Sequence, residues 1–585
     1  MSPTSSEPAS PTKELKPSSD SMSTRQHEAD ANSYEDTMTA TTEPLPAPAP
    51  GPNNAVDPSE ALFKPRSPGF WLVIASAYLS FFLVALDRTI IATAIPAITN
   101  TFHSIEDIGW YGSSYMLTCA IFNPLFGKIF QLYNTKRTFL ASIVIFEAGS
   151  ALCGAAPNSS ALIVGRAIAG IGAAGIGCGA IMITVVLVPL RKRPIFTSFF
   201  GLAFGVSSVV GPVVGGSFTD SPHLTWRWCF YINLPIGAFA MICALLLLHL
   251  PVENKPKKTI IEQIKSLDPL GLFFFVPSMV CFILALQWGG TTYPWSAPKV
   301  IGLLFTFAVT FIAFLVVEWK MPDTAMAPPR VVLQRSVGGS MIFTFLLGGG
   351  MMNAVYYLSI WFQAAQGQTA MQAGIRIIPM VIALVLFGIF TAIVTQKIGY
   401  YAPNMLLSPV LASIAAGLLS TLTPNASNGK WIGYQILYGL GLGVGAQSAN
   451  LATQTVLPRS DVALGTAMMF FMQQLGGSVF LSVGQNIFSQ QLVKQLSGIA
   501  GLDTEAIINT GVTDLRKVVP ANDINTVVGA YSYSLTRCFL LAAALNAAMI
   551  IGSLMIEWKS IKKGKGDAPK DAEANVEGVK EKTEQ

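Results

Sequence analysis

Charged residues are scarce in this chain. Asp, Glu, Lys and Arg make up 12% of its 585 residues, whereas soluble domains carry about 25%. Hydrophobic residues make up 51%. A chain with so little charge cannot cover a globular surface facing water, so we expect most of its solvent to be the lipid bilayer.

Residue clusters that hold metals or perform catalysis are also missing from the sequence. Its seven cysteines form no Cys-x-x-Cys pair, and its four histidines are far apart, so no metal site is indicated. The net charge of +5 is not gathered into a basic patch, which argues against a nucleic-acid partner. With no hydrolase triad or nucleotide-binding loop either, we expect no enzyme activity and no cofactor.

Long apolar segments are what the sequence does contain. A helix that spans a membrane needs about 20 mostly apolar residues, and fourteen segments meet that need. Their predicted limits are 70–95, 108–130, 138–156, 161–188, 195–219, 228–250, 268–288, 298–319, 339–362, 373–395, 401–422, 431–456, 463–487 and 531–556. The sequence therefore predicts an all-α membrane protein with about 14 transmembrane helices.

The fourteen spans divide into six, two and six. We predict a first six-helix bundle over 67–250, a linker with two extra central helices over 251–338, and a second six-helix bundle over 339–558. Two bundles joined by a linker is a layout used by transporters. The polar segments 1–66 and 559–585 are expected to be disordered tails.

Lys and Arg residues set the expected orientation. They gather on alternate connections between spans, which places those connections and both termini in the cytoplasm. Two Asn-x-Ser sequons, at Asn158 and Asn425, then fall on short outer loops and are the candidates for glycosylation.

Ionisable residues interrupt several predicted spans. Asp87 lies in the first, Glu147 in the third and Arg166 in the fourth. A charge at the membrane centre costs about 2.5–3.5 kcal/mol on insertion scales, so it should face protein or a water-filled cavity. Two interpretations stay open: Asp87 is a titratable or substrate-contacting group beside the fixed charge of Arg166, with Glu147 as a weaker second candidate for handling protons, or these residues form structural contacts. Arg88 is given less weight, because Arg side chains can extend outward to the interface.

The segment 201–216 is apolar but rich in glycine. Small residues let a helix approach another backbone closely, and Pro212 removes a backbone donor and favours a bend. Gly211, Pro212, Gly215 and Gly216 are therefore candidates for a packing and bending device. Ordinary packing of small residues is the alternative.

Candidates for lining a cavity follow later in the chain. Tyr356, Tyr357, Trp361 and Gln473 would suit a flat apolar ligand that carries polar groups. Aromatic residues in membrane helices also pack against neighbours, and that interpretation remains open.

Several motifs together resemble a known family. They lie at Leu86-Asp87-Arg-Thr89 through Pro96, Gly165-Arg166 through Gly172, Gly211-Pro212-x-x-Gly215-Gly216, and Trp226 through Gly237. The chain is similar in these motifs to the fourteen-span drug:proton antiporters of the major facilitator superfamily, and it looks most like fungal efflux pumps for toxins and drugs. One departure is Gln131, which stands where the superfamily usually has an aspartate.

The resemblance implies a mechanism. A small apolar compound, such as a fungal metabolite, toxin or drug, would be exported in exchange for protons by alternating access. Asp87 would bind the proton, Arg166 would bias its release, and the proton gradient would supply the energy. A monomer in the plasma membrane is expected, with the vacuolar membrane as the alternative.

Two rival functions remain at this point. The same fold could run as a proton-coupled uptake transporter, for example of an iron chelate. A membrane sensor that no longer transports is a more distant alternative, because the sequence offers no folded cytoplasmic domain. The residues do not identify the substrate.

Overall fold

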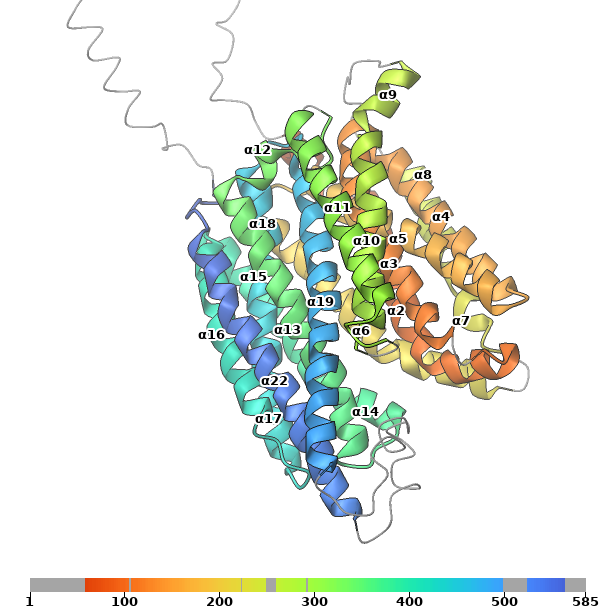
Figure 1. Cartoon of the computed structure of the whole chain (residues 1–585). Coiled ribbons are helices and arrows are strands. Elements are labelled where there is room, and N and C mark those ends of the chain that lie inside the picture. Colours follow the sequence, from red (N-terminus) through yellow and green to blue (C-terminus); the bar gives the residue numbers. More distant parts are fainter. Residues whose placement is uncertain are drawn as a thin grey trace, which may run out of the picture. The chain divides into compact units, whose positions relative to one another are not determined.

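The computed structural model describes residues 58–104, 107–221, 224–248, 259–290, 293–322, 324–497 and 523–562. Within these ranges the regular structure is helical, and the only β pairing consists of two isolated bridges, Gly289 with Tyr293 and Tyr400 with Ser560. Figure 1 shows the helices coloured along the sequence.

The helices are numbered in chain order. Their bounds are α1 (Pro58–Leu62), α2 (Pro68–Phe102), α3 (Ile108–Leu132), α4 (Thr135–Ala155), α5 (Ser159–Leu187), α6 (Arg193–Asp220), α7 (Trp228–Tyr231), α8 (Asn233–Leu247), α9 (Ile260–Ser266), α10 (Pro269–Trp288), α11 (Pro298–Lys320), α12 (Pro329–Val332), α13 (Arg335–Ala364), α14 (Ala370–Arg376), α15 (Ile378–Ile398), α16 (Ala402–Leu419), α17 (Asn428–Gly445), α18 (Ser448–Val456), α19 (Val462–Leu496) and α22 (Ile524–Leu554).

Every predicted span falls on one of these helices or on two consecutive ones. In the described part, 12 helical segments are long and apolar enough to cross a membrane. The other two predicted spans fall on α3, whose apolar run is interrupted by Asn123 and Lys128, and on α17 and α18, which are separate helices. The all-helical membrane fold is confirmed, and the number fourteen stays a prediction.

The predicted tails lie mostly outside the described residues. Residues 1–57 and 563–585 are not described, and the short helix α1 falls within the segment 1–66 that was expected to be disordered.

Side chains and glycine define where several helices begin and end. Asn134 caps α4 by accepting hydrogen bonds from the backbone N–H groups of Lys136 and Arg137, at 3.0 and 3.3 Å. Asn158 caps α5 through Ala161 N–H at 2.8 Å. Gly399 ends α15 with a φ of 92°, a conformation that glycine adopts without a steric cost.

Two sets of helices pack in the same order. In the first half, defined as α2 to α8, α2 packs on α6 and α8, α5 packs on α3 and α4, and α4 meets α8. In the second half, α13 to α22, α13 packs on α19 and α22, α17 packs on α15 and α16, and α16 meets α22. This repeated order supports the proposed division into two six-helix bundles.

The halves meet along two seams. One seam joins α3 to α19, and the other joins α6 to α15. The linker helices α10 and α11 pack on each other, and α10 also contacts both α3 and α19. The extra pair therefore lies over the α3–α19 seam (Figure 1).

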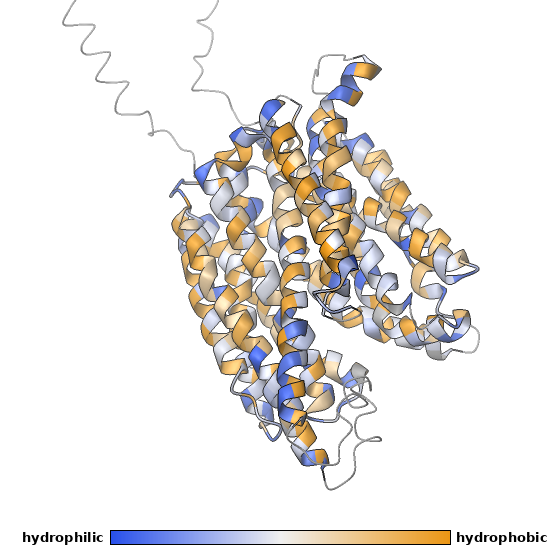
Figure 2. Cartoon of the chain, viewed as in Figure 1, coloured by the Kyte–Doolittle hydropathy of each residue, from blue (hydrophilic) through white to orange (hydrophobic). Residues whose placement is uncertain are grey.

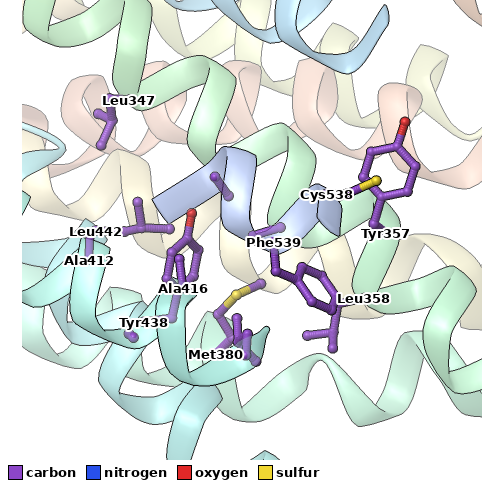
Figure 3. Packing of buried hydrophobic residues seen from close by; sticks show 14 of the residues in the cluster. Leu347, Tyr357, Leu358, Met380, Ala412, Ala416, Tyr438, Leu442, Cys538 and Phe539 are labelled. Atoms are coloured by element: carbon purple, nitrogen blue, oxygen red, sulfur yellow. The ribbon is translucent and has the colours of Figure 1, made fainter. Parts of the chain in front are cut away.

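The hydrophobic cores of the two halves differ in continuity. Most buried apolar residues of the second half form one cluster, part of which is drawn in Figure 3, while Val462, Ala463 and Ala467 of α19 belong to a first-half cluster. Those of the first half fall into two clusters, so that Leu83 and Ile90, on the same helix, belong to different ones. Between them lies a polar layer that consists of Asp87, Ser150, Arg166 and Asn233, all buried.

Apolar side chains also cover the outside of the helices. Orange, the hydrophobic colour, predominates along them in Figure 2. On α11, Phe305 and Trp319 are about 70% exposed, at 69% and 70%. Soluble proteins rarely expose such continuous apolar surface, so these faces are suited to lipid.

Candidate functional site

The polar layer of the first half is centred on an ion pair. Arg166 Nη1 on α5 lies 2.5 Å from Asp87 Oδ2 on α2. The two side chains are 1% and 0% exposed. The sequence identified both residues as charges within apolar spans, and the structure brings them together.

Neighbouring groups make further hydrogen bonds and ring contacts with Arg166 and Asp87. Arg166 Nε donates to the Tyr111 carbonyl at 2.9 Å, and its guanidinium lies 4.4 Å from the centre of the Tyr115 ring. Asn233 at the start of α8 donates to Asp87 Oδ1 at 3.2 Å, and the same amide nitrogen lies 3.2 Å from Ser150 Oγ. Removing one partner of such a buried pair costs about 3–5 kcal/mol, because the other charge is left uncompensated.

Glu147 on α4 lies apart from this hydrogen-bond network. Its two carboxylate oxygens are buried and have no hydrogen-bond partner among the described residues. A Cβ atom at Gly237 of α8 would overlap this carboxylate, so the glycine makes room for it. Buried polar atoms without partners are rare in proteins, which keeps Glu147 a candidate for a functional role.

A cavity of about 170 Å³ lies between the two halves. Both halves contribute to its wall, and most of the wall is apolar. The lining residues are Phe81, Val84, Ala85, Arg88, Tyr115, Cys119, Asn123, Ala173, Gly177, Ile181, Phe200, Gly201, Phe204, Gly348, Met351, Met352, Leu384, Ala446, Gln447, Asn450, Phe470, Gln473 and Gln474.

Arg88 belongs to this wall rather than to the membrane interface. Its Nη1 donates to Gln474 Oε1 of α19 at 3.2 Å, and its Nη2 lies 3.8 Å from Met116 Sδ. Sequence reasoning underrated this residue, because an arginine that extends outward and one that faces a cavity look alike in the chain. Tyr115 joins the two sites, since it lines the cavity and also lies under Arg166.

Of the four candidates for lining a cavity, Gln473 does so. Tyr357 is fully buried in the second-half core (Figure 3), where its hydroxyl donates to the Leu481 carbonyl at 3.2 Å. Trp361 is also fully buried and donates to Ser532 Oγ at 3.0 Å, whereas Tyr356 is 47% exposed. In this conformation Tyr357 and Trp361 are packed in the core, Tyr356 is about half exposed, and none of the three is part of the cavity wall.

The glycine-rich helix α6 has two packing faces. A Cβ atom at Gly215 would lie 2.8 Å from the Ile90 carbonyl oxygen, and one at Gly211 would lie 3.1 Å from the Ile90 nitrogen, so these glycines pack against α2. A Cβ atom at Gly205 would lie 2.9 Å from Val385 of α15, in the other half. Gly216 faces open space. Glycines of α6 therefore pack against two different helices, α2 and α15, and the helix continues through Pro212.

Gln131, which stands where the superfamily usually has an aspartate, also makes a contact between the two halves. Gln131 at the end of α3 donates from Nε2 to Asp461 Oδ1, just before α19, at 2.8 Å. Arg330 of α12 lies 3.3 Å from the same carboxylate oxygen. Gly127 permits the helices to approach, because a Cβ atom there would lie 2.6 Å from Ala467 Cβ. A neutral amide thus makes a cross-half contact at the predicted cytoplasmic end.

The two sequons lie on exposed positions. Asn158 is exposed and caps α5, and Asn425 is exposed in the connection between α16 and α17. Their glycosylation stays a prediction. Within the described residues, no group of three or more His, Cys, Asp or Glu side chains is placed to hold a metal ion.

Comparison with known proteins identifies the family to which this architecture belongs. Residues 77–481 match the model of the Major Facilitator Superfamily. An MFS-type efflux pump, MFS1, of Trichophyton rubrum is 49% identical over 493 residues, which are 84% of this chain and 92% of that protein. The efflux pump aflT of Aspergillus parasiticus is 44% identical over 499 residues, 85% of this chain and 96% of that protein.

A solved structure shares the fold. The crystal structure of the human organic anion transporter MFSD10 (TETRAN) matches with a TM-score of 0.54 at 14% identity, and the match covers 82% of this chain and all (100%) of that one. The family model and the similar fungal proteins lead to one conclusion: this chain is a multi-pass membrane transporter, not an enzyme, and belongs to the Major Facilitator Superfamily.

Proposed function

We propose that this transporter exports a small, mostly apolar organic compound in exchange for protons, by alternating access of a cavity between its two halves. The observation that carries the proposal is the fully buried Asp87–Arg166 pair, which lies directly beside Arg88 of the cavity wall in the sequence of α2 and is linked to that wall by Tyr115. The similar fungal proteins named as efflux pumps support the outward direction.

Asp87 is the proposed proton carrier. Its carboxylate is held by one charged donor, Arg166, and one neutral donor, Asn233. Protonation of Asp87 would remove the charge that balances Arg166, and arginine cannot lose its own proton. The proton therefore changes the interaction between α2 and α5, which is how a local charge event can bias two packing arrangements. Glu147 remains the second proton-coupling candidate.

Movement is proposed to occur at the seams. The structure has cross-half contacts at the predicted cytoplasmic end, through Gln131 with Asp461 and through the close approach of Gly127 to α19. These contacts would have to open to admit cargo from that side. On α6, Gly211 and Gly215 fit the helix against α2 and Gly205 fits it against α15, so that one helix takes part in packing within a half and between halves.

The test measures accumulation of a panel of apolar fungal metabolites in yeast cells that express the chain. Export lowers accumulation relative to cells with an empty vector, and an uncoupler that collapses the proton gradient should remove the difference. Asp87→Asn should be correctly inserted yet behave like the empty vector. Normal export by Asp87→Asn would refute its role as proton carrier.

Asp523→Asn is the matched control, because Asp523 lies before α22 and makes no side-chain capping hydrogen bond. It should export normally. Higher rather than lower accumulation with the intact chain would identify proton-coupled uptake instead. The same cells, imaged with a fluorescent fusion, distinguish plasma membrane from vacuolar membrane.

A further inference from the structure

Arg88 is the only charged side chain among the described residues that line the central cavity. The wall contains no Asp or Glu that could neutralise it. Its described hydrogen-bond partners are an amide oxygen of Gln474 and the sulfur of Met116, which are both neutral. The guanidinium stays protonated at all physiological pH values, so the cavity carries a positive charge with no counter-charge.

Arg88 and Arg166 differ in whether their positive charge is neutralised by a neighbouring carboxylate. Arg166 has a carboxylate at 2.5 Å and a carbonyl at 2.9 Å. Arg88, one position after Asp87 on the same helix, faces the cavity, and its partners do not compensate its charge. Ionised residues within membrane spans are costly and are found where they face a cavity or a partner. None of the described residues on the cavity wall supplies a negative charge to Arg88, and a bound solute would supply it.

Two further polar groups on the same wall lack partners. Gln447 Oε1 and Asn450 Oδ1, beside the break between α17 and α18, are buried without a hydrogen-bond partner. Buried amides without partners are uncommon in proteins, and a ligand that brings polar atoms would satisfy them. The apolar part of the wall includes, beside aliphatic side chains, the aromatic and thioether side chains of Phe81, Phe200, Phe204, Phe470, Met351 and Met352.

We propose that the cavity binds its cargo as an organic anion: an apolar, mostly aromatic acid whose carboxylate, phenolate or enolate oxygen pairs with Arg88. The fork of the guanidinium suits an anionic oxygen pair, while the aromatic and methionine side chains cover the ring system. This inference rests on the proposed function for the identity of the cavity as the cargo site, and it specifies the charge of that cargo. A cationic compound would be repelled by the same residue.

The experiment measures equilibrium binding of 9-anthracenecarboxylate and of its neutral analogue 9-anthracenecarboxamide to the purified full-length protein, by fluorescence anisotropy. The intact protein should bind the carboxylate about tenfold more tightly than the carboxamide, because one charge-assisted contact is added. In Arg88→Gln this ratio should fall to about one, through loss of carboxylate affinity alone. Arg88→Lys should give an intermediate ratio, because it keeps the charge without the fork.

Gln474→Glu provides a second variant that leaves Arg88 in place. It puts a carboxylate where Arg88 Nη1 now finds an amide oxygen, and it should abolish the preference for the anion even if Arg88→Gln folds poorly. Arg537→Gln is the matched control, because this arginine lies against Tyr533 on α22, away from the cavity wall. It should keep the tenfold ratio.

A wild-type protein that binds the carboxylate no better than the carboxamide overturns the inference. So does a tenfold preference that survives in both Arg88→Gln and Gln474→Glu. Because binding is measured without a gradient, normal export by Asp87→Asn would contradict the proposed proton coupling and leave this result standing. Likewise, an intact protein that shows no preference for the carboxylate would contradict the inference about Arg88 and would not contradict export measured in cells.

Discussion

At the centre of the first half, helices meet at an ion pair with no access to solvent, whereas at the centre of the second half they meet through neutral groups. There Asn546 donates to the Tyr438 hydroxyl at 3.2 Å, and Trp361 donates to Ser532. Apart from Asp461, just before α19, the buried polar residues described in the second half are uncharged. The two halves share one packing order but differ at their centres: the first holds a buried ion pair, and the second holds neutral polar groups within its apolar core.

The difference in charge explains the difference in core continuity. The first-half core is divided at the level of Asp87, Ser150, Arg166 and Asn233, because apolar side chains cannot occupy the positions taken by this layer. The buried polar groups of the second half are neutral apart from Asp461, and one large apolar cluster runs through that half. The variants below test whether this division is real, beginning with the largest expected effect.

Arg166→Met should be the most damaging change. It leaves Asp87 buried without its charged partner, at a cost of about 3–5 kcal/mol, so the purified protein should melt at a clearly lower temperature and export should be lost. The double variant Asp87→Leu with Arg166→Met should recover most of the thermal stability and still fail to export. A double variant no more stable than the single one would show that the pair is not the source of the cost.

Gly215→Leu should have the second largest effect. Its side chain would meet the Ile90 carbonyl, since a Cβ atom already lies 2.8 Å away, and overpacking of this kind costs about 1–3 kcal/mol. Export should fall about tenfold as α6 is pushed away from α2. The control is Gly216→Leu, one residue further along and facing open space. Equal export by the two variants would remove the packing role assigned to Gly215.

Tyr438→Phe should have the smallest effect. It deletes one hydrogen bond between neutral groups, which in membrane proteins averages about 0.6 kcal/mol and reaches at most about 1.7 kcal/mol. The melting temperature should fall slightly and export should stay within about twofold of the intact protein. A loss of export as complete as that of Asp87→Asn would mean that the second half also carries essential polar chemistry.

Helices and charges could be predicted because they depend on local sequence. Each predicted span needs only a run of apolar residues, and Asp87 and Arg166 stand out against such runs. The partner of each charge could not be derived in this way. Asn233 lies within the motif from Trp226 to Gly237, but sequence reasoning assigned it no role. It donates a hydrogen bond to Asp87, and this contact could not be predicted because the two residues are 146 positions apart in the chain.

Side-chain direction around a helix is what sequence did not provide. Arg88 was given less weight because an arginine can extend outward, yet it faces the cavity. Of the two interpretations left open for Tyr357 and Trp361, a cavity wall or core packing, the structure shows core packing. On a membrane helix that is apolar on all sides, periodicity does not mark which face meets protein, lipid or cavity. The two packing faces of α6 were hidden for the same reason, because small residues fit against any close backbone.

The position of α10 over the α3–α19 seam has a consequence for how a solute in the bilayer reaches the centre of the protein. On that side a lipid-dissolved molecule meets two further helices before the seam. On the other side it meets the α6–α15 seam, with Leu202 and Val206 of α6 and Ile382 and Leu386 of α15 turned outward. The lateral route from the membrane is thus unequal on the two sides, and an apolar blocker that inserts from the lipid should act at the α6–α15 side.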